Sequence, residues 1–244
     1  MNLPGLGDIH DQYLALARLA RERGVPESDS LGGKLLLRVG FDAEGISVLI
    51  AAALAGAASL CLDPEPELLR EGLRHGLCDF LVADLSEALR ILKNEIRRRR
   101  AVSVCVAADP KALLAEMADR GVQPDLLSVE PGDSRGAHIF RERGAMPVPK
   151  ADRAPDTALL EWAIETGASR ALPRLAQIAQ AALDDRREDM PARRHWLAHA
   201  PRWLGRSWAG RQCLRMTPDE AEVFAQQARA EFPTASIFVG PDLG

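Results

Sequence analysis

Aromatic residues and cysteines are scarce in this sequence, and neither sign of charge dominates it. Aromatic side chains make up 5% of the 244 residues, and the four cysteines form no C-x-x-C pair. The formal net charge of −4 provides no general attraction for nucleic acid or anionic membranes. The longest apolar run, residues 46–62, is shorter than the roughly 20 residues of a membrane span. We therefore expect neither a disulfide framework nor a membrane or nucleic-acid partner.

Several functional motifs are also absent. The N-terminus lacks a basic region followed by an apolar one, so we expect no signal peptide and a location in the reducing cytoplasm. Neither G-x-S-x-G nor H-E-x-x-H occurs. Gly33-Lys34 is not typical of a P-loop, because no Ser or Thr follows the lysine and the pair precedes an apolar run. Hydrolase, zinc-protease and P-loop functions therefore have no motif to support them.

Strand and helix patterns alternate through the first two-thirds of the chain. Helices are expected over residues 8–24, 45–56, 65–76, 85–100 and 110–121. Short, continuously apolar runs are typical of parallel strands buried on both faces. These runs cover residues 34–40, 58–63, 79–84, 101–107 and 124–130. The sequence therefore predicts an α/β fold, a doubly wound parallel sheet of about five strands resembling the Rossmann fold.

The pattern changes around residues 147–155, where prolines and charged residues predict a linker. We accordingly divide the chain into a Rossmann-like domain, residues 1–150, and a mainly helical region, residues 151–244. In the second part we expect a helix over 156–185, broken at Pro173, and another opened by Thr217. Two short runs, QCLRM and ASIFVG, predict a minor β element.

Phrases within residues 13–149 resemble the NAD-binding central domain of urocanase. LGGKLLLRVG is similar to the strand that leads into that family's glycine-rich loop. LREGLRHGLCD resembles its R-x-x-x-G-Y-x-D phrase, and RGVQPD resembles its RGV-x-PD phrase. The resemblance implies a homodimer that uses NAD as an electrophile to add water to urocanate. It covers a little over half of the chain, and 244 residues cannot hold a whole urocanase.

The chain departs from the family at the cofactor positions. The glycine-rich loop of the family reads roughly GLGGMSGAQ, and here it is GFDAEGISV, which keeps two glycines and adds two carboxylates. The acid of the family's EVD phrase falls on Cys61, and its GN becomes Ala108-Asp109. The DQTSxH motif becomes VEPGDS, which loses its Asp and His. The residues at the cofactor positions are Gly40, Asp42, Gly45, Asp63, Asp109 and Glu130.

Carboxylates in this loop oppose a diphosphate, so NAD binding requires a compensating cation. Three functions therefore remain open. The first is a non-catalytic module that binds a small ligand or a protein in the old cleft. The second is an NAD-dependent lyase that retains Gly40, Gly45 and Asp63, and the third is a structural or oligomeric role. A polar cluster after the fifth predicted strand is a further candidate for the pocket, together with Glu44. The cluster consists of Asp133, Ser134, Arg135 and His138.

Residues 193–211 interleave five arginines with three tryptophans and contain no acidic residue. Such a segment suits an anion or nucleic-acid site with stacking surfaces. It also suits a helix whose tryptophans anchor the C-terminal region while its arginines stay solvated or pair with acids, and we favour this interpretation. His195 and His199 share a helix face at i, i+4 spacing, which is half of a metal site or a surface pair.

Overall fold

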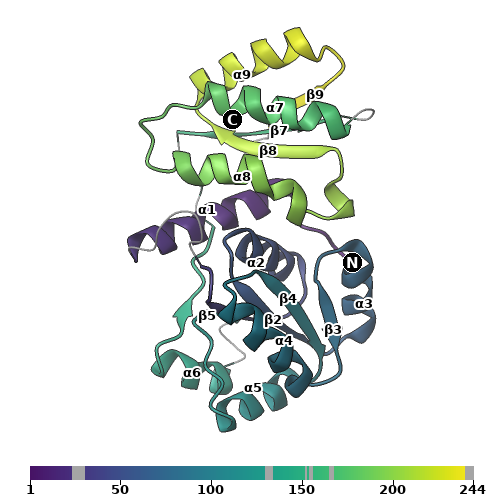
Figure 1. Ribbon diagram of the computed structural model, residues 1–244, viewed down its shortest axis with the longest axis vertical. Coiled ribbons are helices and arrows are strands. Elements are labelled where there is room, and N and C mark those ends of the chain that lie inside the picture. The colour runs from purple at the N-terminus through teal and green to yellow at the C-terminus, as the bar shows by residue number, and fades with distance from the viewer. Residues whose placement is uncertain (24–30, 130–133, 152, 154–155, 165–167, 240–244) are drawn as a thin grey trace.

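A computed structural model describes residues 1–23, 31–129, 134–151, 153, 156–164 and 168–239 (Figure 1). Its larger sheet has six parallel strands in the order β3-β4-β2-β1-β5-β6. The strands are β1 (Leu35–Val39), β2 (Ala58–Asp63), β3 (Phe80–Val82), β4 (Val102–Ala107), β5 (Leu126–Ser128) and β6 (Met146–Pro147). The five predicted strands are confirmed, and β6 adds a sixth at the start of the expected linker.

Helices cover both faces of this sheet. Neighbouring residues of β1 point to opposite sides, because Leu36 joins one buried cluster while Leu35 and Leu37 join the other. The first cluster contains side chains of α1 (Leu6–Glu22), α2 (Ala43–Leu54) and α3 (Pro66–His75), and it continues into the C-terminal region. The second contains side chains of α4 (Leu85–Arg97), α5 (Pro110–Asp119) and α6 (Ser134–Glu142). The predicted doubly wound, Rossmann-like architecture is therefore confirmed.

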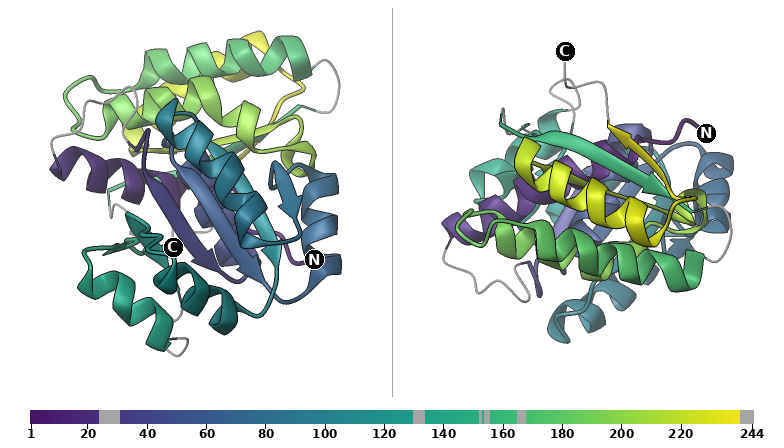
Figure 2. Two further views of the ribbon diagram at one scale, coloured as in Figure 1. Left: turned by 60° about the horizontal axis from the view of Figure 1, so that its bottom comes forward. Right: turned by 90° about the horizontal axis from the view of Figure 1, so that it is seen from above.

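A smaller antiparallel sheet lies in the C-terminal region, in the order β8-β7-β9. Its strands are β7 (Ala158–Ala163), β8 (Arg211–Met216) and β9 (Ser236–Val239). It is accompanied by α7 (Ala168–Ala182), α8 (Met190–Trp203) and α9 (Pro218–Glu231), as the turned views show (Figure 2). The region is thus an α+β unit, with more strand than the short β element that the sequence predicts.

The predicted helix over 156–185 is wrong in its first part. Residues 158–163 form the central strand β7, in which Ala158, Leu160 and Trp162 are buried and the residues between them are half-buried. This two-residue period lies in a run so apolar that a helix fits it as well. Pro173 lies inside α7 and does not break it. It is the sixth residue of α7, where its missing N–H removes one backbone hydrogen bond of the helix.

Helix α1 lies between the two sheets and contacts both α2 and the C-terminal elements β8 and α8 (Figure 1). Asp11 of α1 accepts two hydrogen bonds from Arg215 of β8, at 2.6 and 2.7 Å, and both side chains are buried. Trp196 of α8 packs edge-on against His10 and donates from Nε1 to the Cys213 carbonyl at 2.7 Å. The N-terminal helix therefore joins the two parts of the chain.

Candidate functional site

The loop after β1 lies where ligands bind in this architecture. β1 is flanked by β2 on one side and β5 on the other, so the direction of winding reverses there. Gly40 follows the strand with φ +92°, a conformation that favours glycine. A Cβ atom on Gly45 would lie only 2.3 Å from the Gly40 carbonyl oxygen. Both glycines are therefore needed for the tight turn into α2.

Asp42 occupies the N-terminus of α2. Its Oδ1 accepts a hydrogen bond from the Gly45 amide at 2.7 Å and one from Arg38 Nη2 at 2.8 Å. Arg38 is a buried residue of β1 that also donates to the Gly40 carbonyl at 3.1 Å and to Ser128 Oγ at 3.0 Å. A helix N-terminus at this position is where sites of this architecture hold a phosphate. Here the carboxylate of Asp42 occupies the position at the helix N-terminus that a phosphate would take.

Asp63, at the end of β2, is also engaged by the backbone. Its Oδ2 accepts from the Phe41 amide at 2.8 Å, and its Oδ1 accepts from the Glu65 amide at 2.9 Å. The side chain is buried, and it ties the loop after β1 to the loop after β2. In dinucleotide sites the acid at this strand end binds ribose hydroxyls. The Asp63 oxygens already hold two amides of their own chain, so the group is fixed in a structural role within the loop.

A small cleft remains at this edge of the sheet. It has a volume of about 340 Å³, and its lining includes Arg38, Gly40, Asp42, Asp109 and Lys111. Asp109 caps α5 by accepting from the Lys111 amide at 3.2 Å. Of the predicted cofactor positions, Gly40, Asp42 and Asp109 therefore meet in one cleft, whereas Gly45 and Asp63 support its loop. Glu130 lies outside the described residues.

Of the other predicted polar groups, those that the structure describes do not line this cleft. Glu44 lines a separate cavity of about 460 Å³, with Asp8 and Asp11 of α1. His138 is exposed and pairs with Glu142 at 3.1 Å. Asp133 and the side chains of Ser134 and Arg135 lie outside what the structure describes.

Arg38 is the residue that the sequence interpretation missed. It is the one charged side chain within the strand LLLRV, and it is buried. A charge inside a buried strand needs a partner nearby, which is the signal that could have identified it. Cys61, at the family's acid position, lies directly below the loop, with Sγ 3.7 Å from the Gly40 carbonyl oxygen.

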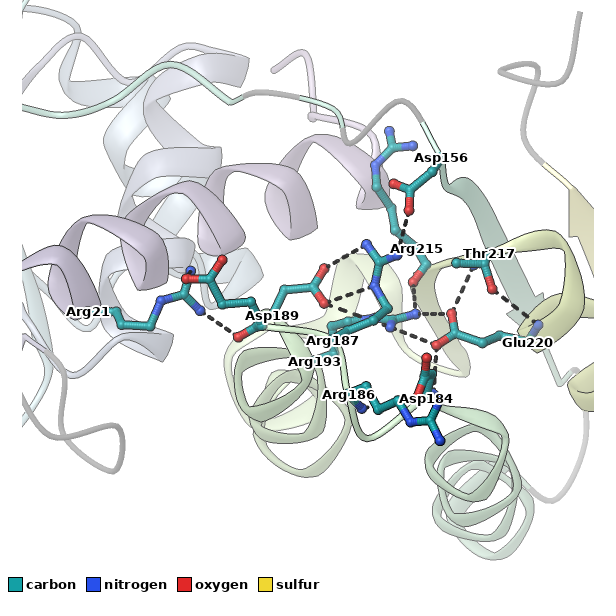
Figure 3. A network of polar contacts seen from close by, with 11 residues as sticks. Arg21, Asp156, Asp184, Arg186, Arg187, Asp189, Arg193, Arg215, Thr217 and Glu220 are labelled. Carbon is teal, nitrogen blue, oxygen red and sulfur yellow. Dashed lines mark hydrogen bonds and ion pairs between the residues drawn. The ribbon is translucent and has the colours of Figure 1, made fainter.

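Several arginines and tryptophans of residues 193–211 have partners inside the molecule, and Figure 3 shows those of Arg193. The buried Arg193 donates to both carboxylate oxygens of Glu220, at 3.0 and 2.6 Å, and to the Arg215 carbonyl. Arg194 pairs with Asp185 at 2.6 Å, and Arg211 pairs with Glu161. Trp196 and Trp208 are buried. These contacts match the favoured anchoring interpretation.

The two histidines of α8 differ in their surroundings. His195 Nε2 lies 3.1 Å from the Leu54 carbonyl oxygen of α2, and the ring stacks on Tyr13. The His199 ring is 4.3 Å from that of His195 and is exposed. Among the residues that the structure describes, no group of three or more His, Cys, Asp or Glu could hold a metal ion. None of the described helices is long and apolar enough to cross a membrane.

Six parallel strands, helices on both faces and a two-glycine turn into a helix N-terminus define a Rossmann-type domain whose ligand edge is filled by its own aspartates. The family model of the urocanase Rossmann-like domain matches residues 6–140, more than half of the chain. The chain belongs to the urocanase family, and the suspected resemblance is confirmed. The match ends near α6, so the smaller sheet lies outside it.

Proposed function

We propose that this protein is a non-catalytic member of the urocanase family that binds a small polar ligand at the carboxyl edge of its sheet in place of NAD. The observation that carries the proposal is the position of Asp42. Its carboxylate caps α2 and pairs with Arg38, so the helix N-terminus and the nearest buried cation are both engaged by one internal anion.

Electrostatics argues against a diphosphate in this loop. A second carboxylate, Glu44, lies in the first turn of α2 beside Asp42. A phosphate placed at the helix N-terminus would meet these two negative charges, and it would have to displace Asp42 from Arg38. Asp63 is buried and already accepts two amides of its own chain, so little of its carboxylate faces a ribose. The residues present therefore do not fit the family cofactor.

The remaining cleft favours a smaller ligand with polar groups. At about 340 Å³ it lies near the lower end of the usual size range of ligand sites, about 300–1,000 Å³. Its walls carry charges of both signs, with Arg38 and Lys111 opposing Asp42 and Asp109. A compact molecule that offers both hydrogen-bond donors and acceptors suits this lining. A peptide segment of a partner protein is the other occupant that the sequence leaves open.

The competing function is an NAD-dependent lyase related to urocanase. It is favoured by the glycine turn, because Gly40 and Gly45 keep the close backbone approach that a dinucleotide loop needs. Under that function Asp42 would have to swing away from the α2 N-terminus when the cofactor enters. The two functions therefore differ in whether wild-type protein holds NAD.

The deciding experiment starts with purified protein, which is denatured so that released small molecules can be analysed for NAD by mass spectrometry. An NAD titration followed by thermal shift accompanies it. We expect no NAD and no shift up to millimolar concentrations. Stoichiometric NAD, or a saturable shift at micromolar concentrations, would instead establish the lyase.

Asp42→Ser provides the matched variant, since serine still caps a helix but carries no charge. If Asp42 is what excludes the dinucleotide, the variant shifts with NAD while wild type does not. Asp84→Ser, at the N-cap of α4, is the control, because it changes a cap far from the cleft in the same way. A wild-type protein that responds to NAD as strongly as Asp42→Ser would refute the proposed role of Asp42.

The cellular setting belongs to the same proposal. Cys61, Cys78, Cys105 and Cys213 are all free and buried, which supports a reducing cytoplasm. Hydrogen bonding with Cys61 and Cys78, together with burial, raises the pKa of the Cys105 thiol, so it stays protonated and unreactive. A homodimer, as in urocanases, is the assembly that we propose, and light scattering of the purified protein tests it.

A further inference from the structure

A polar cavity lies beside α1 and α2 and is separate from the cleft at the sheet edge. It has a volume of about 460 Å³. Its lining comes from residues 4–12, from the start of α2 and from the segment 150–153. Glu44 lines this cavity, whereas Asp42, two residues earlier, lines the cleft of the proposed function. A ligand in the cavity is therefore independent of the function proposed above.

Part of the lining of this cavity is both polar and buried. Asp11, Gln12 and Ser47 line it, and each is more than nine-tenths buried. Asp11 already bonds to Arg215. Gln12 Nε2 donates to the Pro149 carbonyl at 3.0 Å, but Gln12 Oε1 accepts no hydrogen bond among the described residues and stays accessible to solvent. An accessible acceptor on a buried side chain favours a ligand that donates a hydrogen bond.

Charges of opposite sign line the cavity from the helices and from the segment 150–153. The helices contribute the carboxylates of Asp8 and Glu44, and the segment contributes the cations Lys150 and Arg153. Within the part of the chain that the structure describes, no ion pair joins these two carboxylates to the two cations. Arg153 Nε lies 3.8 Å from Asp11 Oδ2 instead. Separated charges of both signs in one cavity suit a ligand that itself carries both signs.

We propose that this cavity binds a free α-amino acid with a polar side chain. Its ammonium group bonds to the carboxylates of Asp8 and Glu44, and its carboxylate bonds to Lys150. A polyamine would be repelled by the two cations, and a dicarboxylate would be repelled by the two carboxylates. The volume of the cavity lies in the usual range of small-molecule sites, about 300–1,000 Å³. The bound amino acid connects α1 and α2 to the segment that leads into the C-terminal region.

The test uses isothermal titration calorimetry of the full-length protein with L-glutamine as the probe. We expect saturable binding of one molecule per chain. Glutaramic acid, which is glutamine without the ammonium group, and 4-aminobutanamide, which is glutamine without the carboxylate, are the analogues. Each should bind about tenfold more weakly or worse, the loss expected for one charge-assisted hydrogen bond. Absence of saturable L-glutamine binding, or equal binding of either analogue, would overturn the proposal.

A lysine variant tests the contact with the carboxylate. Lys150→Gln should weaken L-glutamine binding about tenfold, but it should leave binding of 4-aminobutanamide unchanged, because that analogue has no carboxylate. Lys93→Gln, at an exposed lysine of α4, is the matched control and should bind L-glutamine like wild type. Equal losses for both compounds, or the same loss in Lys93→Gln, would refute the role of Lys150.

A filling variant locates the ligand. Ala151→Trp adds a large side chain at an exposed position of the cavity lining and should weaken L-glutamine binding at least tenfold. Ala230→Trp, at an exposed position of α9, is the matched control and should bind like wild type. Thermal unfolding of both variants checks that they are folded. Unchanged binding by Ala151→Trp would overturn the proposal, because the amino acid would then occupy another site.

Discussion

Asp42 combines two roles that are separate in most helices. As the N-cap of α2 it satisfies the Gly45 amide, and as a counter-ion it pairs with Arg38, whose side chain is 2% exposed. Its own side chain is 63% exposed, so solvent weakens the ion pair but reaches little of the arginine. The arrangement stabilises the loop after β1 without a ligand.

Replacement of Asp42 by alanine should therefore cost more than the loss of a cap alone. We expect Asp42→Ala to lower the free energy of unfolding by about 2–3 kcal/mol, against about 1 kcal/mol for Asp84→Ala, which loses only the cap of α4. Chemical denaturation measures both. Added phosphate should restore stability to Asp42→Ala alone, because the variant frees Arg38 and the α2 N-terminus for an anion. Equal losses in the two variants would show that the Arg38 pair contributes nothing.

Two serines that face each other across β2 and β4 should respond to mutation in opposite ways. Ser59 is buried, and its Oγ has no hydrogen-bond partner among the described residues. Ser103, its neighbour in register, bonds to the Asp79 amide at 3.0 Å and to Asp79 Oδ2 at 3.1 Å. Ser59→Ala should be neutral or stabilising by up to about 1 kcal/mol, and Ser103→Ala should destabilise by about 1–2 kcal/mol. Thermal unfolding of both variants checks the sign.

The sequence predicted where the site residues lie, but it could not predict which hydrogen bonds they make. Asp42 and Asp109 follow predicted strands and Asp63 ends one, and parallel strands bring such residues to one edge of the sheet. Which amide each carboxylate accepts depends on the orientation of loop peptides, and no sequence pattern encodes that. The same limit hid Arg38, whose three acceptors come from its own strand end, from α2 and from β5.

The helices and strands that the sequence predicted well have a clear period of apolar residues and clear residue signals at their ends. Gly76 and Gly121, the last residues of two predicted helices, have positive φ, and the capping box of Thr217 and Glu220 is present. β7 was missed because its apolar alternation is short and was taken as the start of the helix that follows, although Gly167 stands between them in the sequence. Its partners, β8 and β9, lie about 50 and 75 residues later, so pairing rather than local sequence fixes it.

Helix α1 carries a buried histidine that should make folding sensitive to pH. Burial lowers the pKa of His10, and it outweighs the opposing hydrogen bond from the His10 ring to the Asp11 carboxylate. The ring therefore stays neutral in the folded protein at a pH where the unfolded chain binds a proton, below an ordinary value of about 6.5. Because the unfolded state then binds more protons, stability falls as the pH decreases from about 7 to 5.

His10→Gln removes this titration and should flatten the stability curve between about pH 7 and 5, even though it lowers stability overall. The wild-type slope is at most about 1.4 kcal/mol per pH unit for one proton. Urea midpoints at several pH values measure the slope. His138→Gln, at a side chain that is 67% exposed, is the control and should leave the slope unchanged. A slope that persists in His10→Gln would assign the effect to other groups.

In the whole molecule, the two sheets are joined by packing contacts of α1 as well as by the chain that connects them. α1 belongs to the N-terminal part in sequence, but it packs against β8 and α8 as well as α2. The buried pair of Asp11 and Arg215 and the ring contact of His10 with Trp196 cross this junction. Loss of either sheet would expose these groups, so neither part can unfold without a large cost to the other.

We therefore expect the whole protein to unfold in one transition. All four tryptophans, Trp162, Trp196, Trp203 and Trp208, lie in the C-terminal part, so their fluorescence reports on that part alone. Far-ultraviolet circular dichroism reports on the helices and strands of both parts. The urea midpoints from the two signals should coincide. Asp11→Ala, which removes the carboxylate that Arg215 bonds, should lower both midpoints together. A fluorescence transition that precedes the circular dichroism change would instead show that residues 1–150 and 151–244 fold as independent domains.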